Sequence, residues 1–162
     1  MVDRMAVSRL LVACAVPVLL TAGCGEEGTT SDGSIPAGEV QAVTTTFERF
    51  FDSSIAVDQK AALLENGQVF VETLERQANS SIAGGATASV SQVDGNGPGR
   101  AAVTFTINKH GIPLLLNRHG TALRIDGSWK VAAQTFCDLL RVQGGPPAVC
   151  DAAPATAPSP TR

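Results

Sequence analysis

The chain has 162 residues, of which 44% are hydrophobic, and its formal net charge at pH 7 is −3. This apolar content excludes a wholly disordered chain, and the length is typical of one domain. The lack of a basic surplus argues against binding to a nucleic-acid backbone. The sequence contains no tyrosine, two histidines and one tryptophan, so much of the usual acid–base chemistry lacks its side chains. We therefore expect a protein that is not an enzyme and has no cofactor.

The N-terminus has the pattern of an export signal. Arg4 and Arg9 form a short positive region, and an apolar run interrupted only by Pro17 follows over residues 10–20. A helix that spans a bilayer needs about 20 apolar residues, whereas this shorter run is typical of the core of a signal peptide. We predict that residues 1–23 are a signal peptide.

Small residues precede a cysteine at the end of this segment, in the run Leu20-Thr21-Ala22-Gly23-Cys24. The run resembles the lipobox of bacterial lipoproteins, with its leucine one place earlier than usual. The resemblance implies that the Cys24 thiol receives a diacylglyceryl group and that cleavage leaves this cysteine as the first residue. Two or more acyl chains, such as palmitate, anchor a protein stably in a membrane. The alternative is an ordinary secretory signal cleaved near Ala22, in which Cys24 has no role.

Two other cysteines, Cys137 and Cys150, lie in the part of the chain that would be exported. An even pair in an oxidising compartment favours a disulfide, and the turn-forming residues 144–147 would bring Cys150 back to Cys137. The alternatives are two free thiols or two metal ligands. A metal site needs three or four ligands, so we expect no metal at this pair.

Composition divides the rest of the chain into three parts. Residues 24–35 are mostly small and polar, and this composition predicts a flexible tether. Residues 151–162 are rich in alanine and proline without a large apolar side chain, and we expect them to be disordered. Residues 36–150 remain as one domain with a modest core.

The first half of this domain has helical periodicity. A first helix begins at Pro36 and ends at residues 52–54, and its apolar side chains recur at three- and four-residue steps: Val40, Val43, Phe47 and Phe50. Asp58 is predicted to cap a second helix, which Asn66-Gly67 ends. A third helix carries Val69, Phe70, Leu74 and Ala78 on one side and ends at residues 79–81.

From Ala86 the period changes to two, which indicates strands. The glycine-rich turn at residues 94–99 separates a first strand from a second one, in which alternate residues are apolar: Ala101, Val103, Phe105 and Ile107. Pro113 confines the start of a third strand to an edge or a bulge, and Gly120 predicts a kink. Asp126-Gly127 is a hairpin signal before a fourth strand over residues 128–132, and residues 136–142 form a closing helix. The order of elements predicts an α+β fold with three N-terminal helices packed on one face of a four-stranded antiparallel meander.

The block Asp126-Gly127-Ser128-Trp129-Lys130-Val131, followed by Thr135-Phe136-Cys137-Asp138-Leu139-Leu140, resembles the C-terminal domain of the mycobacterial low-molecular-weight antigen MTB12 family. The resemblance covers residues 36–142. It implies a cone-like fold of the nuclear-transport-factor-2-like or cystatin-like kind on exported actinobacterial proteins. It implies no activity.

A cone-like fold would place a pocket between the sheet and the helices. The candidate lining residues are the aromatic ones, Phe47, Phe50, Phe70, Phe105 and Trp129. The competing interpretation is that these side chains simply fill the core.

His110 and His119 flank a segment that would bring them together if it folded back on itself. Two histidines beside Lys109 and Arg118 make a poor metal site, so solvated histidines are the simpler interpretation. The nearby cationic set would attract anionic lipid headgroups if it formed one face of the sheet, and otherwise it is a scattered solvated surface: Lys109, His110, Arg118, His119, Arg124 and Lys130.

These patterns together predict a lipoprotein anchored through Cys24 on the extracytoplasmic face of the cell membrane. We expect a non-enzymatic binding module for a small apolar molecule or a cell-envelope partner, without nucleic acid. Two alternatives stay open: an acid–base enzyme on the same scaffold, and an accessory subunit without a pocket that is recognised through an exposed apolar sheet face.

Overall fold

A computed structural model describes residues 34–81 and 83–151. The predicted signal peptide at 1–23, the lipidation residue Cys24, most of the predicted tether and residues 152–162 of the predicted tail lie outside the described residues. In the described part, no helix has the length and apolar character needed to cross a membrane.

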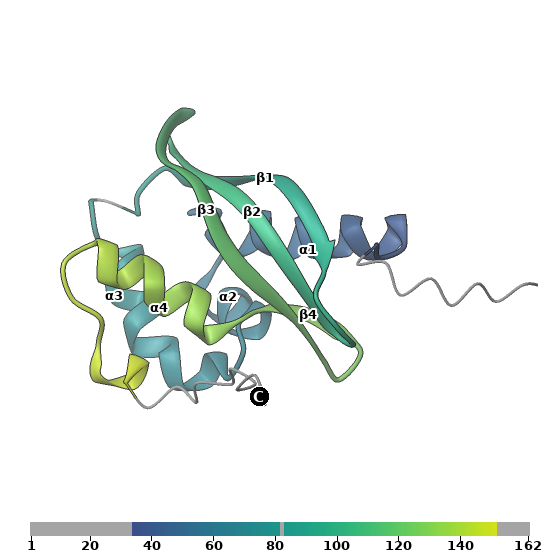
Figure 1. The fold of residues 1–162 in the computed structure, drawn as a ribbon. Helices are drawn as coiled ribbons and strands as arrows, with labels where there is room; N and C mark the ends of the chain where they lie inside the picture. Colours follow the sequence, from purple (N-terminus) through teal and green to yellow (C-terminus); the bar gives the residue numbers. More distant parts are fainter. Residues whose placement is uncertain (1–33, 82, 152–162) are drawn as a thin grey trace, which may run out of the picture. The chain divides into compact units, whose positions relative to one another are not determined.

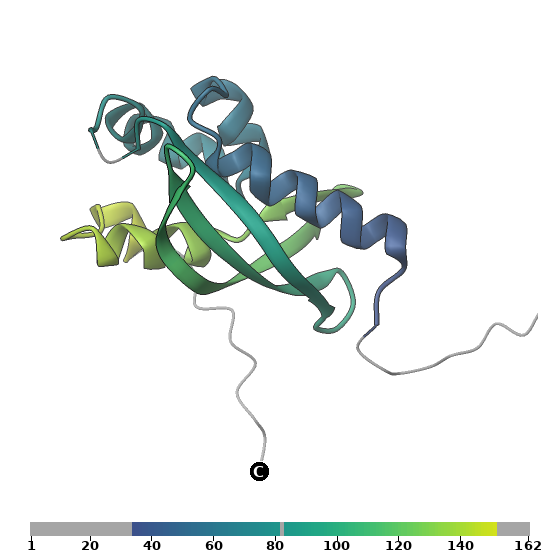
Figure 2. The same cartoon turned by 90° about the horizontal axis from the view of Figure 1, so that it is seen from above.

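The described residues form an α+β fold, with four α-helices and one open sheet of four antiparallel strands in the order β1-β2-β3-β4. Along the chain the elements are α1 (Ala37–Phe51), α2 (Val57–Leu63), the 3₁₀ helix η1 (Gly67–Phe70), α3 (Val71–Ala78), β1 (Ala86–Gly95), β2 (Arg100–Lys109), β3 (Ile112–Ile125), β4 (Ser128–Val131), α4 (Ala133–Val142) and the 3₁₀ helix η2 (Ala148–Cys150). Helix α1 lies across one face of the sheet, and α2, α3 and α4 gather at one side of the molecule (Figures 1 and 2).

Helix α1 follows the predicted apolar pattern. Pro36 precedes its first residue, and Val43, Phe47 and Phe50 are buried, as is Thr46. The helix ends where the sequence indicates, because the Asp52 carboxylate accepts a hydrogen bond of 2.8 Å from the Ser54 backbone N–H. This local turn competes with further helical hydrogen bonding.

The second and third helices differ from the sequence prediction. Asp58 lies inside the first turn of α2, and Ala56 is the capping position. The helix ends before Asn66-Gly67 because Leu64 forms an isolated bridge with Val131 of β4, a contact far away in the sequence. Asn66, at φ 51°, starts η1 instead of ending α2.

The third helix, α3, begins only at Val71, after η1. Val69, which helical spacing placed in the core, lies within η1 and is 61% exposed. Its neighbour Phe70 is buried, as predicted.

Strands β1 and β2 form the predicted hairpin. The alternating side chains of β2 that were expected to face inward are all buried: Ala101, Val103, Phe105 and Ile107. The register between β1 and β2 shifts at Val90/Gln92, which marks a bulge in β1.

Strand β3 is longer and more continuous than its sequence suggests. Its last four residues, 122–125, pair with β4, so the half that contains Pro113 has no β4 partner. Pro113 also lies at a register shift between β2 and β3, which confirms the prediction of an edge or bulge position. Three aliphatic side chains of this half are exposed: Ile112, Leu114 and Leu116.

The last hairpin has the predicted two-residue turn, with Asp126 at φ 51° and Gly127 at φ 78°. Strand β4 stops at Val131, and α4 begins at Ala133, three residues earlier than predicted. The Glu65 carboxylate accepts a hydrogen bond of 3.0 Å from the Ala133 N–H. A distant acidic side chain therefore stabilises the N-terminus of α4.

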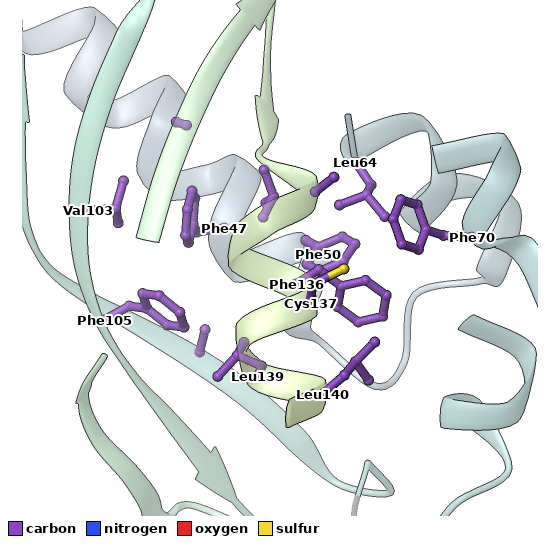
Figure 3. Close-up of a cluster of buried hydrophobic side chains, with 14 of the residues drawn as sticks. Phe47, Phe50, Leu64, Phe70, Val103, Phe105, Phe136, Cys137, Leu139 and Leu140 are labelled. Carbon is purple, nitrogen blue, oxygen red and sulfur yellow. The ribbon is translucent and has the colours of Figure 1, made fainter. Parts of the chain in front are cut away.

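A connected group of phenylalanine rings forms the core (Figure 3). The Phe47 ring lies 5.3 Å from the Phe105 ring of β2, and the Phe50 ring lies 5.4 Å from the Phe136 ring of α4. Phe136 in turn lies 5.8 Å from Phe70. The buried core residues in the described part of the chain lie within residues 43–150, and a chain that begins at Cys24 contains all of them.

Gly120 of β3 allows this packing, because a side chain there would collide with three neighbours. An added Cβ would lie 2.7 Å from Thr135 Cγ2, 3.0 Å from Phe105 Cε1 and 3.2 Å from Phe47 Cε1. Close approach of α1 and α4 to the sheet thus requires glycine at this position.

We expect Gly120→Ala to lower the free energy of unfolding by about 1–3 kcal/mol through overpacking. The control is Gly38→Ala, because an added Cβ at this α1 residue meets nothing within 4 Å. That change should stabilise the protein slightly, by at most about 1 kcal/mol. Urea unfolding of both variants measures the difference, and equal effects would contradict the assigned contacts.

The Sγ atoms of Cys137 and Cys150 lie 2.08 Å apart, at disulfide distance, and the two Cα atoms are 5.5 Å apart. Cys137 is fully buried in α4, and Cys150 ends η2. The bond therefore fastens the end of the domain to a core helix.

We expect Cys150→Ala to lower the free energy of unfolding by about 3 kcal/mol, because the cross-link no longer restricts the unfolded chain. The parent protein treated with a reductant should match this variant in urea unfolding. If reductant leaves the parent unchanged while Cys150→Ala destabilises it, the loss comes from side-chain packing and not from a cross-link.

Candidate functional site

A hollow lined mainly by apolar side chains lies where the end of α1, helices α3 and α4, and the neighbouring ends of β1, β2 and β3 converge. The hollow has a volume of about 530 Å³, within the range of about 300–1,000 Å³ that is usual for small-molecule sites. We call it the apolar cavity. Its described lining residues are Phe50, Phe51, Ser53, Lys60, Leu74, Gln77, Ala78, Ala83, Gly84, Gly85, Ala86, Ile107, Leu114, Leu115, Phe136, Leu139, Val142 and Gln143.

Aromatic rings that belong to the core also form walls of the apolar cavity. Phe50 and Phe51 come from the last turn of α1, and Phe136 comes from α4. The Phe51 ring stacks on Phe105 with centroids 5.2 Å apart, so its position is set by the sheet. These walls are rigid because the same rings pack in the core.

Aliphatic side chains at the rim connect the cavity with the surface. Leu114 is 50% exposed and Val142 is 51% exposed, and both line the cavity. An apolar molecule in the cavity would therefore cover side chains that now contact water.

The backbone at the start of β1 forms another part of the lining. The His110 N–H donates a hydrogen bond of 2.9 Å to the Gly85 carbonyl, and Lys109 Nζ donates one of 2.6 Å to the Ser81 carbonyl. Gly85 has a positive φ of 73°, and the His110 ring occupies the space that a side chain there would need. These contacts fix the segment before β1 to the β2–β3 hairpin.

Lys60 of α2 is the one ionisable side chain among the described lining residues of the apolar cavity. Burial lowers the pKa of Lys60, and attraction by the Asp52 carboxylate offsets part of this shift. The pKa of Asp52 is lowered mainly by its hydrogen bond to the Ser54 backbone, with a smaller contribution from Lys60. A half-buried cation therefore stands at an otherwise uncharged apolar surface.

A second hollow, of about 600 Å³, lies on another part of the domain. Its lining contains many small or turn residues, one phenylalanine and two oppositely charged side chains: Ala61, Ala62, Leu64, Asn66, Gly67, Gln68, Val69, Phe70, Ile125, Asp126, Lys130, Ala133 and Val149. Its lining contains one phenylalanine, whereas the lining of the apolar cavity contains three. Substitutions in the second hollow therefore serve as controls in the binding experiments described below.

The aromatic residues expected to line a pocket divide between core and site. Phe47 and Phe105 are fully buried core residues, and Phe70 lines only the second hollow. Trp129 lines neither hollow. Of the five predicted residues, Phe50 alone lines the apolar cavity.

Trp129 instead joins a contact between the sheet and α1. Its indole N–H donates a hydrogen bond of 2.9 Å to the Glu39 carboxylate, and Arg124 Nη1 donates one of 2.6 Å to the same carboxylate. Glu39 thus holds the first turn of α1 against β3 and β4.

The structure does not bring His110 and His119 together. His110 occupies the β2–β3 turn, at φ 50°, whereas His119 pairs with Thr104 farther along the hairpin. The predicted basic set also divides between the two sheet faces. Arg124 faces α1 through Glu39, while His119 lies beside Thr104 on the side opposite the buried β2 residues.

The sequence alone did not single out Lys60, Phe51, Phe136 or Leu139 as lining residues. Phe51 follows Phe47 by four positions, so helical spacing was a usable signal for it. The others line one cavity only because helices distant in the sequence converge.

A family model described as the C-terminal domain of low molecular weight antigen MTB12 matches residues 36–147. The chain belongs to this family. The match confirms the predicted resemblance and includes every described helix and strand except η2. A search of curated proteins finds no match to the chain. The span that matches the MTB12 family contains Lys60 and Cys137, whereas Cys150 follows the last matched residue.

We expect Asp52→Asn to lower the pKa of Lys60 further, because the substitution removes a neighbouring negative charge that favours the protonated amine. NMR titration of the ¹³C-dimethylated lysines, with Lys60→Arg to assign the signal, measures this shift. A Lys60 pKa that is unchanged or raised in Asp52→Asn would contradict the assigned interaction.

Proposed function

We propose that this MTB12-family protein is a lipid-anchored, extracytoplasmic binding protein whose apolar cavity holds a small apolar molecule. The observation that carries the proposal is the cavity itself, with its three phenylalanine rings and exposed aliphatic rim. Concave apolar sites with few polar groups are the usual form of small-molecule binding sites.

The proposed location rests on two features of the sequence and one of the structure. Residues 1–23 have the pattern of a signal peptide, and Cys24 stands where lipoproteins receive their diacylglyceryl group. Cys137 and Cys150 lie at disulfide distance, which suits an oxidising compartment outside the cytoplasm. Acyl chains on Cys24 would keep the domain at the membrane surface.

The proposed role is binding and not catalysis. Acid–base catalysis needs a positioned proton donor or acceptor near the reacting atoms, commonly with a partner that tunes it. Lys60 is the single ionisable side chain among the described lining residues, and the charged residues of the second hollow belong to another site.

We also propose that the scaffold is cone-like, of the nuclear-transport-factor-2-like or cystatin-like kind. The position of α1 across one face of the antiparallel sheet supports this assignment (Figure 2).

The test compares two exposed helical alanines that line different hollows. Ala78 lines the apolar cavity and Ala62 lines the second hollow. In a chain from Cys24 onward with Cys24→Ser, we expect the neutral probe N-phenyl-1-naphthylamine to bind with increased fluorescence. Ala78→Trp should weaken binding by roughly tenfold or more by occupying the cavity, a change of about 1.4 kcal/mol per factor of ten.

Ala62→Trp should bind the probe like the parent protein. Equal weakening by both substitutions, or no probe binding by a folded parent, would overturn the proposal. Circular dichroism of each variant confirms that the folds remain comparable.

A further inference from the structure

We propose that the ligand of the apolar cavity is a single-chain amphiphile with one carboxylate head, and that the Lys60 ammonium binds this head. This inference rests on the proposed function and assigns its ligand class. It follows from the distribution of charge around the cavity.

The lining of the apolar cavity suits a hydrocarbon chain. Apart from Lys60, the described lining residues carry no ionisable side chain, and most are aromatic or aliphatic. Such a surface binds a hydrocarbon chain by removing apolar area from water. Besides Lys60, the polar side chains among the described lining residues are Ser53, Gln77 and Gln143, which suits a ligand whose polar part is confined to one end.

Lys60 makes no direct ion pair with the other described residues. Burial disfavours its charged form, as the lowered pKa shows. A carboxylate at this position would supply an opposite charge, which the described residues do not place in direct contact with Lys60.

The Asp52 carboxylate favours a ligand head with a single negative charge. Asp52 lies near enough to attract Lys60, although the two side chains form no ion pair. Its carboxylate is held by the Ser54 N–H at 2.8 Å and would repel an anionic head more strongly as the negative charge of that head increases. A monoanionic head therefore fits this site better than a dianionic phosphate head.

The experiment uses dodecanoate and dodecanol, which have the same chain length and differ in their head groups. Each competes with N-phenyl-1-naphthylamine for the chain from Cys24 onward with Cys24→Ser, below the critical micelle concentration. We expect dodecanoate to compete better than dodecanol. Lys60→Met should weaken dodecanoate by roughly tenfold and leave dodecanol within about twofold of the parent.

Two controls separate charge from packing. Lys130→Met removes a cation from the second hollow and should change neither competitor. Lys60→Arg should restore most of the preference for dodecanoate, because it keeps a positive charge. Dodecyl phosphate, carrying more than one negative charge at neutral pH, should compete less well than dodecanoate.

The outcomes distinguish this inference from the proposed function. Equal competition by dodecanoate and dodecanol, equal weakening of both by Lys60→Met, or stronger competition by dodecyl phosphate overturns the assigned head group while the cavity remains a binding site. Failure of the probe and of every competitor to bind the folded parent overturns both proposals.

Discussion

The contact between α1 and the inner face of β2 is the interaction on which the rest of the domain depends. Phe47 and Phe51 of α1 both contact Phe105, at 5.3 and 5.2 Å between ring centroids. Phe50 of the same helix contacts Phe136 of α4 at 5.4 Å. One turn of α1 therefore joins the sheet to the last helix. Gly120 permits this arrangement because it leaves room for Phe47, Phe105 and Thr135.

The apolar cavity is a consequence of the same packing. Phe50 and Phe51 are adjacent in the sequence and their rings lie 4.8 Å apart at an interplanar angle of 80°. Their different orientations allow one helix end to contact the sheet and α4 together. Beyond these rings, α3 and the β2–β3 hairpin contribute apolar side chains on other sides. The walls of the cavity are consequently core residues, and the rim contains the side chains with freedom to adjust.

Local sequence patterns were sufficient to predict much of this fold. The spacing of Val43, Phe47 and Phe50 identified the buried face of α1, and the alternation of Val103, Phe105 and Ile107 identified that of β2. Asp126-Gly127 located the last hairpin because both residues adopt a positive φ. In these elements local preference and tertiary packing favour the same conformation.

The structure differs from the sequence prediction where contacts between residues distant in the sequence determine the conformation. Leu64 has suitable spacing for α2 but pairs with Val131, and Glu65 extends α4 by accepting the hydrogen bond of Ala133. Neither partner can be identified from the neighbouring sequence. The neighbouring sequence likewise does not single out Lys60, a lysine on the short helix α2, because the cavity that it lines is formed by elements distant in the sequence.

The apolar cavity and the hydrophobic core share phenylalanine rings, so ligand binding and folding stability depend on the same side chains. A ligand that binds the native cavity and not the unfolded chain stabilises the native state, by an amount that grows with the logarithm of its free concentration relative to its Kd. Because Phe50 and Phe136 serve both the cavity and the core, a substitution that removes either ring would weaken the fold and the site together. Lys60 and Ala78 lie outside the core cluster. Substitutions at these two residues can therefore separate ligand recognition from folding, which substitution of the aromatic wall cannot do.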